Sequence, residues 1–204
     1  MDSPWTTSCR AFAAAAEWFV ATSALVGGRW DEPGLGEWDV RSLVGHTSRS
    51  LLTVESYLRK PAASVEVGST ADYYRATRAA AAGPDVAARG REAGQVLGTD
   101  PAAAVAEIAS RVVPLVAACA GTEVITTIAG GMRLADYLPT RTFELVVHTA
   151  DLAAALGVPT EPPPFPAAQA FELVARLAVD AGLASPLLRA ATGREGLPPG
   201  FTVL

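Results

Sequence analysis

The chain has 204 residues, 50% of them hydrophobic, and 16 Lys and Arg against 21 Asp and Glu give a formal net charge of −5. This length fits one domain with a substantial core and, at most, a small appendage. The acidic balance removes the general electrostatic reason to bind nucleic acid or an anionic membrane, so we expect small-molecule or protein partners instead.

The first predicted helix covers residues 4–26. Ser3 can cap it, Pro4 suits its first turn, and a glycine pair follows the last apolar position. Residues 29–38 contain glycine and proline and are typical of a loop. Asp39 can cap a second helix, which is expected to end before Pro61.

Alanine-rich segments predict the next two helical regions. One starts at Ser69 or Thr70, is interrupted at Gly83-Pro84 and resumes towards Gln95. The next covers about residues 101–119 and opens with an Asp-Pro pair, which suits a helix start.

An extended segment and a long helix follow. Residues 123–128 are rich in β-branched side chains but alternate poorly, so we expect a short extended piece rather than a sheet strand, ended by Gly130-Gly131. The apolar spacing over residues 132–156 predicts a long helix, whose start Pro139 should bend or delay.

The carboxy-terminal part is expected to be an extension of the main domain. Residues 158–166 hold five prolines and predict a stiff linker. A helix at about residues 167–181, a shorter one near Leu187 and an irregular tail at 196–204 follow it. Because so few residues cannot bury a core of their own, we expect them to pack on the preceding domain. The candidate docking residues are Phe171, Leu173, Val174, Leu177 and Leu187.

Targeting and thiol chemistry are not indicated. Asp2 and Glu17 flank or interrupt the amino-terminal apolar stretch and no basic region precedes it, so no signal peptide is expected. No apolar run approaches the ~20 residues that span a bilayer, and we expect a cytoplasmic protein. Cys9 and Cys119 form no CxxC pair, which favours two buried free thiols over a catalytic nucleophile.

A polar stripe marks the helix predicted at residues 132–156. At about 100° per residue, Arg141, Glu144, His148 and Asp151 fall within roughly a quarter-turn of one another, among apolar neighbours. Charged groups in such surroundings have to be paired or to coordinate something. The spacing of Glu144 and His148, one turn apart, lets a carboxylate and an imidazole bind one divalent ion.

The only other histidine, His46, lies on the predicted second helix, again among apolar residues. If the two helices pack together, His46, Glu144 and His148 form a two-histidine, one-carboxylate site, which suits zinc, nickel, iron or manganese and leaves positions open for water or substrate. In the alternative, Arg141 and Glu144 form an ordinary ion pair and each histidine makes one core hydrogen bond.

The two remaining polar residues of the stripe are candidates for roles beside that site. Asp151 can orient a bound water or accept a hydrogen bond from an imidazole N–H. Arg141 can pair with Glu144 or hold a substrate carboxylate.

Three segments carry a resemblance to a known family. WDVRSLVGH at 38–46, GGMRLADYL at 130–138 and RTFELVVHTADL at 141–152 resemble, in order and spacing, the DinB-like mycothiol-dependent maleylpyruvate isomerase amino-terminal family, over about residues 8–157. The resemblance implies an all-α fold, an antiparallel four-helix bundle that holds a divalent metal, usually zinc. The ligands carried over onto this chain are His46, Glu144 and His148.

The resemblance also implies domain limits and a chemistry. Residues 1–157 would form the metal-binding bundle, and residues 158–204 the proline linker and a short helical segment packed on it. The family's activities use a low-molecular-weight thiol, mycothiol in actinobacteria, and the Ala, Arg, Gly and Pro bias here resembles an actinobacterial coding sequence. The isomerase that names the family carries a second α/β domain, whereas only 47 residues follow Gly157, so maleylpyruvate is not the expected substrate.

The implied activity is therefore a metal-dependent, thiol-using isomerase or S-transferase that acts on a small electrophilic substrate. Arg141 and Asp151 are the candidate catalytic residues, and a homodimer is compatible with the pattern. Two alternatives remain open: a non-catalytic metal- or ligand-binding regulatory bundle, and a metal-assisted hydrolase with Asp151 as its base.

Overall fold

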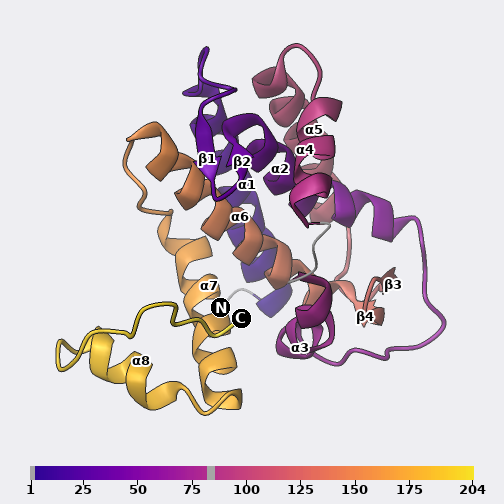
Figure 1. Ribbon diagram of the computed structural model, residues 1–204. Coiled ribbons are helices and arrows are strands. Elements are labelled where there is room, and N and C mark those ends of the chain that lie inside the picture. Colours follow the sequence, from indigo (N-terminus) through magenta and orange to yellow (C-terminus); the bar gives the residue numbers. More distant parts are fainter. Residues whose placement is uncertain (1–2, 82–85) are drawn as a thin grey trace.

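The computed structural model describes residues 3–81 and 86–204, and this part of the chain is mostly helical (Figure 1). The helices are α1 (Pro4–Ala24), α2 (Val40–Leu58), α3 (Thr70–Ala81), α4 (Val86–Val96), α5 (Pro101–Ala117), α6 (Leu134–Leu156), α7 (Pro164–Asp180) and α8 (Ala184–Ala191). The strands form two antiparallel pairs, β1 (Pro33–Leu35) with β2 (Trp38–Asp39) and β3 (Val124–Thr127) with β4 (Gly130–Arg133). None of the helices described combines the length and the apolar character that crossing a membrane requires.

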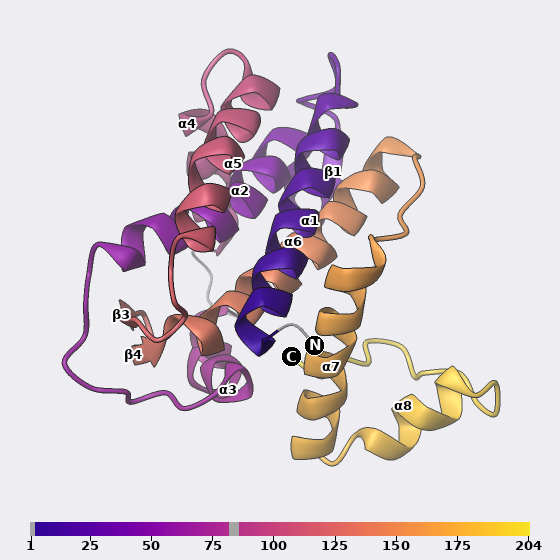
Figure 2. The ribbon, with the colours of Figure 1, turned by 180° about the vertical axis from the view of Figure 1, so that it is seen from behind.

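The core lies where α1, α2, α5 and α6 face one another. Both α1 and α2 pack on α5 and on α6. Their facing sides bury large apolar side chains completely, among them Phe12, Phe19, Leu43, Leu51 and Leu145. Figures 1 and 2 show α6 running beside α1, and α7 flanking both. The all-α fold class expected from the sequence is confirmed, with two small hairpins added.

The helix starts that the sequence predicts are confirmed in atomic detail. The hydroxyl of Ser3 accepts a hydrogen bond from the backbone N–H of Thr6 at 3.1 Å, which caps α1. At the start of α2, the carboxylate of Asp39 accepts from the N–H of Ser42 at 2.7 Å. These side chains satisfy backbone donors that a helix leaves unpaired in its first turn, so both helices begin at their caps.

Two expectations about extended segments were wrong. The predicted loop at 29–38 contains the β1–β2 hairpin, and residues 123–128, which we expected not to form a sheet strand, contain β3, paired with β4. Gly130-Gly131 does not end the extended segment but starts the partner strand. A Cβ atom on Gly131 would lie 2.0 Å from the backbone oxygen of Ser64, so glycine is required by a close backbone approach that local pattern does not reveal.

Glycines also set the contact between α2 and α4. A Cβ atom on Gly45 would lie 2.2 Å from the backbone nitrogen of Gly94, and one on Gly90 would lie 2.5 Å from the ring of Trp38. The two helix backbones therefore touch with no side chain between them. The helix interruption predicted at Gly83-Pro84 lies outside the described residues.

We predict that Gly45→Ala destabilises the protein by about 1–3 kcal/mol, because the added methyl group has to push backbone against backbone. Gly28→Ala is the matched control, since a Cβ atom there meets nothing within 4 Å, and its effect should stay within about 0.5 kcal/mol. Chemical denaturation of both variants measures the difference. Equal unfolding midpoints would contradict the close contact between α2 and α4.

The carboxy-terminal segment packs on the rest of the chain through α7. This helix begins at Pro164, inside the predicted linker, and contacts α6 and α1. As expected, Leu173 and Leu177 are buried, but Phe171 is 71% exposed, so its predicted docking role was wrong. The apolar residues of α7 cover more than one face, and sequence spacing alone does not show which face is buried. Helix α8 buries none of its residues fully and contacts α7, and the tail is irregular as predicted.

We predict that Leu173→Ala lowers the free energy of unfolding by about 2–5 kcal/mol, because it leaves a cavity under α7. Phe171→Ala removes a larger side chain two residues away, from the exposed face, and should change the free energy of unfolding by no more than about 0.5 kcal/mol. Thermal and urea unfolding test the pair. If the exposed phenylalanine proves the costlier loss, α7 docks through a different face.

The two cysteines are free, and neither is fully buried. The prediction that both thiols are free is confirmed, but the prediction that both are buried was wrong. Cys9 and Cys119 lie at the ends of α1 and α5, where the indole N–H of Trp5 donates to the carbonyl oxygen of Cys119 at 2.8 Å. Burial raises the pKa of each thiol, so neither is activated as a thiolate.

Candidate metal centre

Two packed helices bring the three predicted ligands together. α2 carries His46, and α6 carries Glu144 and His148 one turn apart. One potential ligand atom from each of them lies within 4.8 Å of the others, and all three side chains are partly buried. The imidazole rings of His46 and His148 meet edge to face, with centroids 4.9 Å apart.

The orientation of His46 is set by the apolar residues around it. Leu43 and Leu51, on either side of His46 along α2, are fully buried, and the contact between the rings of His46 and His148 shows that His46 points towards α6. Its ring stacks on Trp38 with centroids 4.5 Å apart, and the indole N–H of Trp38 donates to the carbonyl oxygen of Ala87 at 3.0 Å. Trp38, itself fixed by this hydrogen bond, therefore packs against the ring of His46.

His46 has no hydrogen-bond partner among the described residues, and its Nδ1 atom is buried. Burial lowers its pKa to about 4, and the neighbouring His148 contributes to the same shift. The ring is therefore neutral at pH 7 and has a lone pair to offer. A buried histidine with a purely structural role is expected to hydrogen-bond to a neighbouring group. The alternative in which His46 makes one core hydrogen bond is therefore not supported by the described residues.

His148 lies between two carboxylates. Its Nε2 atom is 3.3 Å from Oε2 of Glu144, and its Nδ1 atom is 3.2 Å from Oδ2 of Asp151. Burial opposes protonation of the ring, but the hydrogen bonds to Asp151 and Glu144 outweigh it and raise the pKa of His148 to about 9. Burial likewise opposes ionisation of Glu144, yet His148 and Arg141 lower its pKa to about 2.

A divalent ion held by His46, Glu144 and His148 would have to displace the proton of His148. Nε2 of His148 lies 3.3 Å from the carboxylate of Glu144, and one ligand atom from each of these residues lies within 4.8 Å of one from His46. Nδ1 bonds to Asp151 on the other side of the ring, the usual arrangement of a metal-ligating histidine and its carboxylate partner. The donor set of two imidazoles and one carboxylate fits zinc and leaves a coordination position open.

Arg141 does not form the ion pair with Glu144 that the sequence allowed; none is found among the described residues. Its guanidinium carbon lies 5.0 Å from the ring centre of Tyr137 and 5.4 Å from that of Tyr73. Nε donates to the hydroxyl of Thr140 at 2.8 Å, and the two terminal nitrogens bond to no described residue. The guanidinium is thus held by aromatic rings, while its two terminal nitrogens can still donate hydrogen bonds to a ligand.

Sequence reasoning missed the aromatic residues around the site. Tyr74, in α3, donates from its hydroxyl to Oε1 of Glu144 at 2.8 Å, although 70 positions separate them. Trp38 stacks on His46, and Tyr73 and Tyr137 flank Arg141. The only signal in the sequence was the adjacent pair Tyr73-Tyr74 on a predicted helix, and this pair does not indicate that Tyr74 contacts Glu144.

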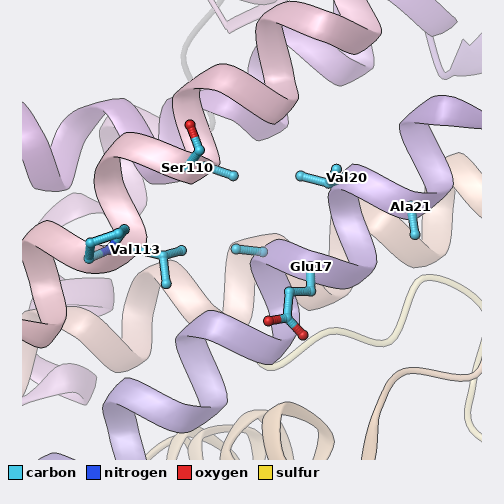
Figure 3. A pocket seen from close by; sticks show the side chains of 8 residues that line it. Glu17, Val20, Ala21, Ser110 and Val113 are labelled. Atoms are coloured by element: carbon cyan, nitrogen blue, oxygen red, sulfur yellow. The ribbon is translucent and has the colours of Figure 1, made fainter.

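A separate groove lies between α1 and α5, with a cavity volume of about 380 Å³ (Figure 3). It is mainly apolar, and Glu17 and Ser110 are its most polar lining residues. None of the three candidate ligands lines it. The groove is therefore not part of the candidate centre.

One protein family matches most of the chain. The family described as the mycothiol maleylpyruvate isomerase N-terminal domain matches residues 11–153. The chain belongs to this family. The matched stretch includes all of α2 and all but the last three residues of α6, and so contains the three candidate ligands. No curated protein and no solved structure matches the chain.

We predict that the two histidines of the metal-free protein titrate far apart. Nuclear magnetic resonance of tag-free, ¹⁵N-histidine-labelled protein should show one ring with a pKa of about 4 and one of about 9. Because the higher value lies above the ordinary ~6.5, His148 stabilises the metal-free fold fully below that pH, and the contribution is lost as the pH rises through about 9.

Asp151→Asn provides the control for this titration. It removes a charged acceptor from Nδ1 of His148 and should lower the higher of the two pKa values while leaving the lower one in place. Two rings that both titrate near the ordinary value would contradict the arrangement of charges described above.

Proposed function

We propose that the protein binds one divalent metal ion, zinc in the first place, through His46, Glu144 and His148. The observation that carries this proposal is the convergence of three ligand atoms within 4.8 Å, on two packed helices, in a member of this family. The buried nitrogen of His46 without a hydrogen-bond partner supports it, since coordination to an ion would compensate for the burial of a polar imidazole. We further infer that α1, α2, α5 and α6 correspond to the antiparallel four-helix bundle of DinB-like proteins.

We also propose a thiol-dependent reaction on a small electrophile, with mycothiol as the thiol because the family's name includes it. When bound, the ion supplies Lewis acidity that lowers the pKa of a coordinated thiol, so that the thiolate forms near neutral pH. Reversible addition of a thiol to an activated double bond supports isomerisation, and retention of the thiol in the product gives an S-transferase.

The protein's own residues have distinct roles in this proposal. Asp151 accepts a hydrogen bond from Nδ1 of His148, which directs Nε2 towards the ion and increases the basicity of the ligand. Arg141 presents terminal N–H groups that can bind the carboxylate of a substrate or thiol and place it beside the site. Tyr73 and Tyr137 cover the faces of the guanidinium, which limits its movement between turnovers.

The alternatives find less support. A regulatory or structural metal site is typically closed by a fourth protein ligand, whereas the group found among the described residues has three. A hydrolase would need Asp151 as base next to the metal-bound water. Asp151 instead contacts Nδ1 of His148, on the side of the ring that faces away from Glu144.

We predict that tag-free protein holds about one divalent ion per chain. His46→Ala and His148→Ala should each lose most of it, because two remaining ligands bind weakly. Elemental analysis after gel filtration measures the metal content. Full metal content in both variants would show that the ion, if any, binds elsewhere.

Arg141→Ala should keep the metal but lower thiol-dependent turnover about 10-fold to 100-fold, since a charge-assisted hydrogen bond contributes roughly 1.5–3 kcal/mol. Glu144→Ala should lose the metal itself. Bound metal and conjugation of mycothiol to a chromogenic aryl halide are measured on the same preparations. If Arg141→Ala loses metal and turnover in parallel, the arginine only supports Glu144 and does not bind an anion.

A further inference from the structure

The two carboxylate oxygens of Glu144 have different neighbours. Oε2 lies 3.3 Å from Nε2 of His148, another candidate ligand. Oε1 lies 2.8 Å from the hydroxyl of Tyr74, which comes from another helix, α3. A phenol is protonated at neutral pH, with an ordinary pKa of ~10, so it donates to Oε1. The carboxylate is therefore held at Oε1 by a donor from another helix, while Oε2 lies beside the candidate ligand His148.

From this geometry we propose that Tyr74 is a positioning residue that fixes Glu144 as a one-oxygen metal ligand. The proposal rests on the metal site proposed above. The hydroxyl also lies 3.2 Å from the carbonyl oxygen of Thr140, but it has only one proton to donate. The nearer and ionised acceptor, Glu144, makes the stronger hydrogen bond.

The ring of Tyr74 is held in place by other aromatic rings. It meets Phe143 edge to face with centroids 5.6 Å apart, and Tyr73 in the same way at 5.9 Å. Such contacts fix the plane of the phenol, so that its hydroxyl cannot follow Glu144 if the carboxylate turns. The hydrogen bond therefore selects one carboxylate orientation.

The helix that carries Tyr74 is itself tied to two neighbours. The hydroxyl of Thr70, at the start of α3, donates to the carbonyl oxygen of Asp136 in α6 at 2.7 Å. Arg75, the residue after Tyr74, donates to the carboxylate of Asp180 at the end of α7, at 2.8 Å. The position of the tyrosine hydroxyl thus depends on contacts of α3 with both α6 and α7.

Loss of this hydroxyl has a definite consequence for the site. Oε1 would lose its partner, and the carboxylate would be free to turn and to bind the ion with both oxygens or in a strained orientation. Removal of such an outer partner typically costs 10-fold to 100-fold in metal affinity. The expected defect is therefore one of metal affinity and geometry, not of catalysis alone.

The chain offers a matched control within the same cluster. All four tyrosines lie in one chain of contacting rings, in the order Tyr57, Tyr137, Tyr73 and Tyr74. The hydroxyl of Tyr57 bonds to none of the described residues. Tyr57→Phe thus removes the same atom from the same cluster without touching Glu144.

The experiment compares zinc affinity, by chelator competition, in the full-length wild type, Tyr74→Phe and Tyr57→Phe, with the absorption spectrum of the cobalt(II)-substituted forms as a readout of coordination. We expect Tyr74→Phe to bind zinc about 10-fold to 100-fold more weakly and to change the cobalt spectrum, while Tyr57→Phe matches the wild type. Wild-type affinity and spectrum in Tyr74→Phe, or an equal loss in both variants, would overturn the role of Tyr74. A wild type that binds no zinc would overturn the metal site itself, which separates the two failures.

Two further measurements keep the test decisive. Thermal unfolding of the metal-free proteins shows whether Tyr74→Phe folds as well as Tyr57→Phe. If it does not fold, the infrared difference spectrum of the wild type on zinc addition takes its place. A wide separation of the carboxylate stretching bands indicates ligation through one oxygen and supports the proposal, and a narrow separation indicates two-oxygen ligation and overturns it.

Discussion

The packing of α2 against α6 is the constraint on which the candidate centre depends. Buried leucines hold the two helices together, Leu43 and Leu51 from α2 and Leu145 and Leu152 from α6. Full burial of one such side chain contributes roughly 1.5–3 kcal/mol, so the apolar contact can offset the cost of desolvating polar groups beside it. Without this contact, the histidine of α2 would have no relation to the polar stripe of α6.

The charges at the centre compensate one another in the metal-free protein. His46 is neutral, His148 carries a proton, and Glu144 is ionised, with pKa values of about 4, about 9 and about 2. A divalent ion would take the place of that proton, so metal binding and deprotonation of His148 are coupled. Arg141 lies against tyrosine faces and forms no ion pair with Glu144 among the described residues, so the direct cationic partner of the carboxylate is His148.

Patterns that are local in sequence were predicted well. The caps Ser3 and Asp39 locate helix starts because each side chain bonds to a backbone N–H only three residues away. The one-turn spacing of Glu144 and His148 places both on one face of α6. His46 was a candidate because it lies among apolar residues of a second helix, but no local pattern could give its distance from α6. The structure brings the three together, and the role of the group as a metal site stays a proposal.

What the sequence did not give depends on contacts between distant segments. The strand at 124–127 pairs with a partner that starts at two glycines, and those glycines are needed because a separate loop passes close by. Phe171 and Leu173 look alike in the pattern of α7, yet only one of them faces α6 and α1. Tyr74 reaches Glu144 from a third helix, and hydrogen bonds between side chains on different helices leave no period in the sequence.

The central claim is that both histidines belong to one site. The most direct test is a zinc titration of the metal-free, tag-free, ¹⁵N-histidine-labelled protein, followed through the imidazole nitrogens of its only two histidines. The two sets of signals should change together and stop changing at one equivalent of zinc, with release of the proton from His148. A titration in which only one histidine responds, or in which neither does, would contradict the shared site.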